Sequence, residues 1–160
     1  MEKQTRESLV KELIQLLEGG NAHVSFEEAC ADIPLELLNK PADGLPYTIW
    51  QLAEHVRIAQ WDILEFCNNP VHESPKWPDE YWPSAEDLAD QQKWETTLAH
   101  IKQDKNQFVE LLHDSNRDLF KPFEHGTGQN LFREALLIAD HTAYHTGQII
   151  LLRRLLHNWS

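Results

Sequence analysis

Residues 131–157 read LFREALLIADHTAYHTGQIILLRRLLH and contain two histidines, His141 and His145, four positions apart. Apolar side chains recur through the stretch at helical spacing, and no proline interrupts it. The pattern predicts one long helix. Because residues i and i+4 lie one above the other on a helix, about 5–6 Å apart at Cβ, both imidazoles can reach a single ion.

This histidine pair supplies only part of a metal site, because catalytic zinc sites use about three protein ligands and leave a position open. Thr142 follows His141, so the HExxH pattern of zinc proteases is absent. Without an ion, two imidazoles on a core-facing helix would need buried hydrogen-bonding partners. Two hypotheses therefore stay open from spacing alone: a shared metal ion, or a pair of core or interface histidines.

Length and composition limit the class of protein. The 160 residues predict a single domain, residues 1–160, with a substantial core. Because the formal net charge is −12 and no block of basic residues is present, we expect the chain to bind neither nucleic acid nor a membrane. Cys30 and Cys67 are far apart and lack a CxxC pattern, which is typical of reduced core thiols. With no signal-like or membrane-spanning apolar stretch, we expect a soluble, cytoplasmic protein.

Apolar periodicity elsewhere predicts three more long helices, over about 4–18, 49–68 and 84–113. Ser84 with Asp87 resembles a capping box and is the expected start of the third of these. A short extra helix is expected near 26–38, and a proline-rich crossover separates the second long helix from the third. The fold class predicted is all-α, a four-helix bundle.

The remaining histidines differ in their setting. His55 lies on the apolar second helix, which ranks it above His100 on the more polar third helix, although alone it is typical of a satisfied core histidine. Glu110 and His113 have the ExxH spacing of di-metal bundles, but no second ExxH accompanies them. Solvated or helix-end roles are expected for the others, which are His23, His72, His113, His125 and His157.

Three segments together resemble a known family. TIWQLAEH at 48–55, IAQWDILEF at 58–66 and DHTAYHTGQ at 140–148 are similar to the DinB/YfiT-like superfamily of metal-dependent enzymes. The resemblance covers nearly the whole chain and implies a four-helix bundle with up-down-down-up topology. It also implies that His55, His141 and His145 bind a divalent metal ion, zinc or nickel above all, and that the protein is a homodimer. Exposed Trp77, Trp82 and Trp159 are compatible with a dimer.

Polar residues at helical spacing from these histidines are candidates for orienting them or moving protons: Gln51, Asp62, Glu134 and Gln148, with Tyr47 on the preceding loop. Asp140 and Tyr144 rank lower because they point to a neighbouring face. No residue is identified as the general base, so the catalytic residues stay unknown. Tryptophans in the crossover are expected to cover a pocket mouth.

Three functions follow as hypotheses. The resemblance favours transfer involving a low-molecular-weight thiol and a small-molecule substrate, because better-understood relatives do this. A metal-dependent hydrolase is the second. The third is a non-catalytic bundle that binds a metal or a small ligand.

Overall fold

A computed structural model of the chain describes residues 2–19 and 22–159. Regular structure in this part of the chain is helical throughout, which confirms the all-α prediction. The elements are α1 (Lys3–Leu17), α2 (Phe26–Cys30), α3 (Leu35–Leu38), α4 (Ile49–Asn68), the 3-10 helix η1 (Asp79–Tyr81), α5 (Gln91–His113) and α6 (Leu131–Leu155).

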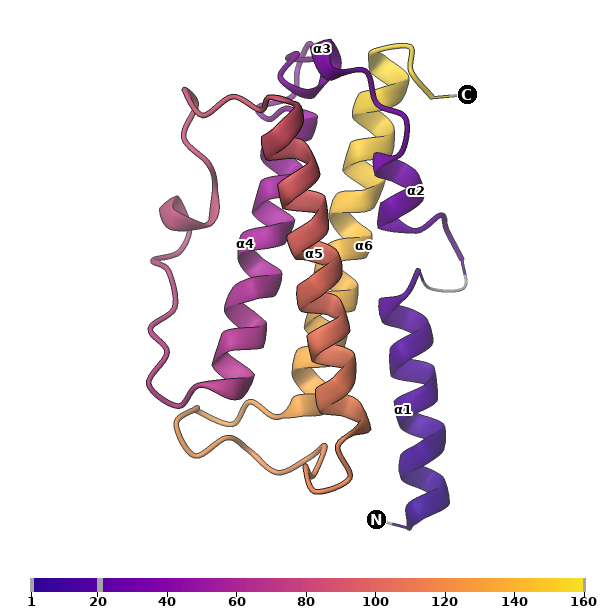
Figure 1. Ribbon diagram of the computed structural model, residues 1–160, viewed down its shortest axis with the longest axis vertical. Helices are drawn as coiled ribbons and strands as arrows, with labels where there is room; N and C mark the ends of the chain where they lie inside the picture. The colour runs from indigo at the N-terminus through magenta and orange to yellow at the C-terminus, as the bar shows by residue number, and fades with distance from the viewer. Residues whose placement is uncertain (1, 20–21, 160) are drawn as a thin grey trace.

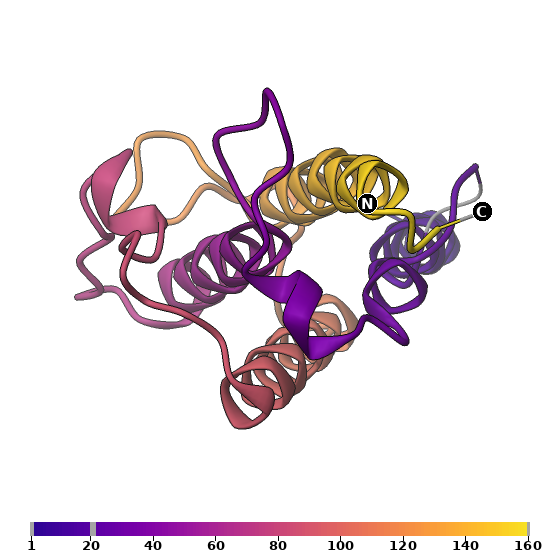
Figure 2. The ribbon, with the colours of Figure 1, turned by 90° about the horizontal axis from the view of Figure 1, so that it is seen from above.

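The four long helices lie side by side (Figures 1 and 2). Helices α1 and α6 run upward in Figure 1, whereas α4 and α5 both run downward. The crossover, residues 69–90, makes this possible by returning the chain to the end of the bundle where α4 begins. Helix α4 packs against both α5 and α6, and η1 of the crossover packs on α4. Side chains on facing sides of α4 and α6 therefore meet beside the crossover.

Polar caps set where the two histidine-bearing helices begin. Thr48 and Gln51 form a capping box at the start of α4, with Thr48 Oγ1 accepting from the Gln51 backbone and Gln51 Oε1 from the Thr48 backbone. The Asn130 side chain accepts from the backbone N–H of Arg133 at the start of α6. Both helices then continue without interruption past their histidines.

Two predictions about helix boundaries need correction. The single short helix expected near 26–38 is two helices, because Pro34 has no backbone N–H and disfavours helical geometry at the residue before it. Helix α5 begins at Gln91, not near Ser84, and its cap is Asp90, whose carboxylate accepts from the Lys93 backbone.

Long-range hydrogen bonds explain the later start of α5. The carbonyl oxygen of Asp87 accepts from the indole N–H of Trp50 at 2.7 Å. Asn39 then pairs its side-chain amide with both backbone groups of Ala89, at 2.8 and 2.9 Å. These contacts hold residues 87–89 outside the helix, against α4 and the loop before it. Leu88 consequently stays 59% exposed instead of joining the buried face of α5.

The apolar core has two parts along the bundle. The upper cluster joins α2, α3 and the first halves of α4 and α5 to the end of α6, and includes Trp50, Leu52 and Leu152. The lower cluster joins α1, the end of α4, the end of α5 and the start of α6, and includes Phe108 and Leu131. Along α6, His141 and His145 lie between residues of the two clusters.

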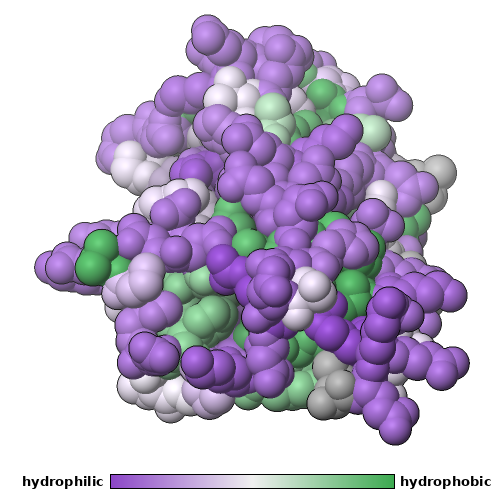
Figure 3. All heavy atoms as spheres, turned by 60° about the horizontal axis from the view of Figure 1, so that its bottom comes forward, coloured by the Kyte–Doolittle hydropathy of each residue, from purple (hydrophilic) through white to green (hydrophobic). Residues whose placement is uncertain are grey.

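The surface is mainly hydrophilic at the lower end of the bundle, where hydrophobic residues form small separate patches (Figure 3). Among the described residues, no helix combines the length and apolar character that crossing a membrane requires.

Candidate metal centre

Three histidines from two helices converge where α4 faces α6. His55 comes from α4, and His141 and His145 come from α6. One ring nitrogen of each lies within 4.8 Å of the others, and the Nε2 atoms of His55 and His141 are 3.0 Å apart. Nitrogen ligands about 2.0–2.1 Å from a tetrahedral zinc ion are about 3.4 Å from one another, so these rings need only small movements to share an ion.

Neighbouring acceptors orient two of the rings. Nδ1 of His55 donates to the main-chain carbonyl of Tyr81 at 2.7 Å, since a carbonyl oxygen can only accept. Nδ1 of His145 donates to Oε1 of Gln148 at 2.6 Å. A neutral imidazole carries one hydrogen, so Nε2 of both rings keeps its lone pair. This pattern of an outer hydrogen bond on Nδ1 and a free Nε2 is typical of metal-binding histidines.

The third ring completes the donor set. His55 Nε2 has no hydrogen to give, so in the 3.0 Å contact Nε2 of His141 donates to it. A move of that hydrogen to Nδ1 of His141 leaves three nitrogen lone pairs converging.

Burial keeps the imidazoles neutral. It lowers the pKa of His141 to about 3, with the neighbouring His145 and His55 contributing in the same direction. It lowers the pKa of His145 to about 4, and it also lowers the pKa of His55, against the opposing effect of the Tyr81 carbonyl. Neutral imidazole is the form that binds divalent ions, so the donor set fits such a group.

Aromatic side chains surround the histidines. The Trp82 ring stacks on His55 with centroids 3.9 Å apart and planes 1° from parallel. Tyr47 stacks on Trp82 at 6.4 Å, and Tyr144 meets His145 edge-on at 4.9 Å. Trp82 is thus the crossover tryptophan that lies directly on the histidine group.

Of the three tryptophans expected to be exposed, only Trp77 is, at 70%. Trp82 and Trp159 are half-buried. Trp82 lies on His55, and the guanidinium carbon of Arg153 lies 4.7 Å from the centroid of the Trp159 ring. Of the three tryptophans that were compatible with a dimer, only Trp77 therefore lies on the exposed surface.

Two of the five polar candidates lie beside the histidines. Gln148 binds His145, and its amide N–H donates to the Tyr47 hydroxyl at 2.9 Å. These two residues form a chain of hydrogen bonds that ends on Nδ1 of His145.

The other three candidates have different partners. The Gln51 amide binds the backbone of Thr48 in the capping box. Glu134 is buried and pairs with Arg133 Nη1 at 2.6 Å, and burial raises its pKa. Asp62 binds His72 and Tyr81 of the crossover. None of these three contacts joins a carboxylate or amide directly to a histidine of the group.

Tyr81 was not among the predicted site residues. It lies 26 positions after His55 in a segment without helical periodicity, so no spacing rule connects the two. His72 was expected to be solvated, but its Nε2 lies 2.8 Å from a carboxylate oxygen of buried Asp62. The only advance signal was the location of both residues in the proline-rich crossover.

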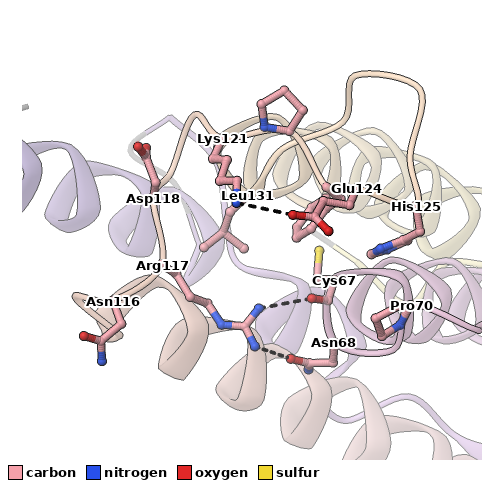
Figure 4. A pocket seen from close by; sticks show the side chains of 12 residues that line it. Cys67, Asn68, Pro70, Asn116, Arg117, Asp118, Lys121, Glu124, His125 and Leu131 are labelled. Carbon is pink, nitrogen blue, oxygen red and sulfur yellow. Dashed lines mark hydrogen bonds and ion pairs between the residues drawn. The ribbon is translucent and has the colours of Figure 1, made fainter.

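A separate hollow of about 610 Å³ lies at the lower end of the bundle, away from the histidine group (Figure 4). Its charged side chains already have partners: Arg117 donates to the Cys67 carbonyl and to Asn68 Oδ1, and Lys121 lies 3.6 Å from a Glu124 oxygen. His125 donates to the Phe66 carbonyl at 2.8 Å. These contacts close the loop after α5 onto the end of α4.

Comparison with known proteins adds one match. A family model described as the DinB superfamily matches residues 21–149, a range that includes all three histidines. Neither the curated proteins nor the solved structures yield a match.

Proposed function

The chain belongs to the DinB superfamily, and from this premise we propose that it is a metal-dependent enzyme acting on a small molecule. The observation that carries the proposal is the convergence of three neutral imidazoles within 4.8 Å. We propose zinc or nickel as the ion, since imidazole suits both. We also assign the bundle the up-down-down-up topology of its family, with α1, α4, α5 and α6 as the four helices.

When bound, a divalent ion lowers the pKa of a coordinated water toward about 7 and deprotonates a coordinated thiol, so either nucleophile becomes available at neutral pH. The chain's own residues have three tasks. His55, His141 and His145 hold the ion. The Tyr81 carbonyl and Gln148 keep the hydrogens of His55 and His145 on Nδ1. Trp82 excludes water from one face of His55.

We favour thiol transfer over hydrolysis, because better-understood members of the DinB superfamily, to which the chain belongs, transfer groups with low-molecular-weight thiols. Both cysteines are buried, and burial raises their pKa, so the described chain offers no reactive thiolate of its own. A nucleophilic thiol would therefore be a separate, low-molecular-weight substrate.

The alternative is a bundle that binds a metal or a small ligand without turnover. Two observations favour it. Trp82 lies directly on His55, and none of the hydrogen bonds to the described histidine group comes from a carboxylate. Such a protein would need no general base.

A turnover assay separates these functions. Zinc- or nickel-loaded protein is given electrophiles with and without a small thiol, and separately ester and amide substrates. Metal-dependent loss of the electrophile that requires the thiol supports the transferase, and hydrolysis without thiol supports the hydrolase. Both activities should disappear in His141→Ala. Metal binding with neither activity supports the binding protein.

We further propose a homodimer formed through the outer face of α6. Leu136, Tyr144 and Leu151 are 41%, 64% and 47% exposed along this face, and Gly147 has open space where a Cβ would lie. Asp140 and Arg154 are equally spaced on either side of Gly147. Two copies that crossed antiparallel at Gly147 would therefore set each Asp140 opposite an Arg154, which suits a two-fold interface.

A further inference from the structure

One carboxylate of α4 binds the crossover at two points. Asp62 is 8% exposed, and its Oδ1 accepts from His72 Nε2 at 2.8 Å. Its Oδ2 accepts from the Tyr81 hydroxyl at 2.6 Å. We call Asp62, His72 and Tyr81 the Asp62 clamp. A buried carboxylate with both oxygens occupied ties the crossover to α4 tightly, because leaving it unpaired would be costly.

Tyr81 extends this clamp to the histidine group. Its hydroxyl binds Asp62, and its main-chain carbonyl accepts from His55 Nδ1 at 2.7 Å. Tyr81 ends η1, and the next residue, Trp82, stacks on the His55 ring. Two successive crossover residues thus contact His55, one at its edge and the other on its face.

We propose that Asp62 is a positioning residue for the metal centre, acting on His55 through Tyr81. The inference rests on the proposed metal-binding function. Asp62 lies seven positions after His55 on the same helix, so α4 carries both the ligand and the anchor of the segment that orients it. While the clamp holds, the Tyr81 carbonyl keeps the hydrogen of His55 on Nδ1, and Nε2 faces His141 with a free lone pair.

Release of the clamp loosens both contacts that the crossover makes with His55, from the Tyr81 carbonyl and from the Trp82 ring. Without the Asp62 contact, Tyr81 is held less strongly, by its backbone hydrogen bond to the Pro78 carbonyl at 3.2 Å, by Ser74 at its hydroxyl and by the ring contact with Trp77. The Tyr81 carbonyl can then shift, and the His55 hydrogen can move to Nε2. That tautomer blocks the nitrogen that faces His141. Outer hydrogen bonds of this kind typically change metal affinity about 10–100-fold when removed.

Tyr81→Phe tests the inference with a small change, since it deletes the hydroxyl and keeps a ring that can pack edge-on to Trp77 as Tyr81 does at 5.3 Å. Zinc affinity is measured by competition with a chelator. The His55 tautomer is measured independently by ¹⁵N chemical shifts in metal-free protein labelled at histidine. We expect an affinity lower by about 10–100-fold at unchanged stoichiometry, and a loss of the Nδ1–H form of His55.

Tyr47→Phe is the matched control. It removes a hydroxyl on the other branch, which reaches His145 through Gln148, so the His55 tautomer should match that of the wild type. Asp62→Asn keeps the size and one acceptor oxygen and should fall between Tyr81→Phe and the wild type in both measurements.

The two measurements keep this inference separate from the proposed function. If Tyr81→Phe keeps the Nδ1–H form of His55, the inference is overturned, even where affinity falls. If the wild type binds no zinc, the metal-binding function fails, and the tautomer comparison alone then decides whether the clamp orients His55.

Discussion

The Nε2 atoms of His55 and His141 lie 3.0 Å apart, although 86 positions separate the two residues in the chain. The contact exists only because α4 and α6 pack against each other. An ion held between these helices would bind the folded chain and not the unfolded one, so metal binding and folding stability are linked.

Acid should destabilise the metal-free protein earlier than carboxylate protonation alone explains. The folded-state pKa is lowered to about 3 for His141 and about 4 for His145, from an ordinary 6.5. As the pH falls below 6.5, the unfolded chain binds protons that the folded chain does not, so the free energy of unfolding decreases. Urea unfolding with a chelator present, at several pH values between about 6.5 and 5, measures this slope. His141→Ala should have a shallower slope, and equal slopes would contradict the burial of this histidine.

Both thiols should be inert in the folded protein. Burial, with Glu134 nearby, raises the pKa of Cys67 to about 12, and burial also raises the pKa of Cys30. Because the thiolate is the reactive form, a disulfide reagent at pH 8 should release almost no product from native protein. Two thiols per chain should react after denaturation. A rapid stoichiometric reaction of the native protein would refute this and would restore a cysteine as a possible nucleophile.

Two leucines should differ sharply in their contribution to stability. Leu112 on α5 is 0% exposed in the lower cluster, whereas Leu88 in the crossover is 59% exposed. Leu112→Ala should lower the free energy of unfolding by about 2–5 kcal/mol through lost burial and a cavity. Leu88→Ala should change it by less than about 0.5 kcal/mol. Chemical denaturation of both variants checks the start of α5, because a helical Leu88 on the buried face would cost much more.

The proposed dimer has its own test. Light scattering should give the mass of two chains for the wild type and of one chain for Leu151→Glu, which puts a charge on the outer face of α6. Val71→Glu is the control, since Val71 is 83% exposed but lies in the crossover. A monomeric wild type, or a dimer that survives Leu151→Glu, excludes this interface.

Local rules predicted much of the fold. Helix α4 begins at Ile49 and ends at Asn68, as apolar periodicity indicated. The start of α5 was wrong for a non-local reason. Ser84 and Asp87 match a capping pattern, but in the folded chain Trp50 and Asn39 bind the backbone of residues 87 and 89.

The residues of the candidate site also fall into two groups, those that the sequence predicted and those that only the structure revealed. The spacing of His141 and His145 predicted a shared face, and the family resemblance added His55. Helical spacing predicted Gln148 as a neighbour of His145, because the two residues are about one helical turn apart. The sequence did not predict Tyr81 and His72 as site residues. The irregular path of the crossover brings His72 to Asp62, and it brings Tyr81 to both Asp62 and His55.

Titration of metal-free protein with zinc and with nickel, followed by calorimetry, measures whether His55, His141 and His145 together hold one ion. The wild type should bind about one ion per chain, and His55→Ala should bind none. His100→Ala, altered at an exposed position on α5, should match the wild type. If the wild type binds no ion, or if His55→Ala binds as many ions per chain as the wild type, the three-histidine centre is contradicted.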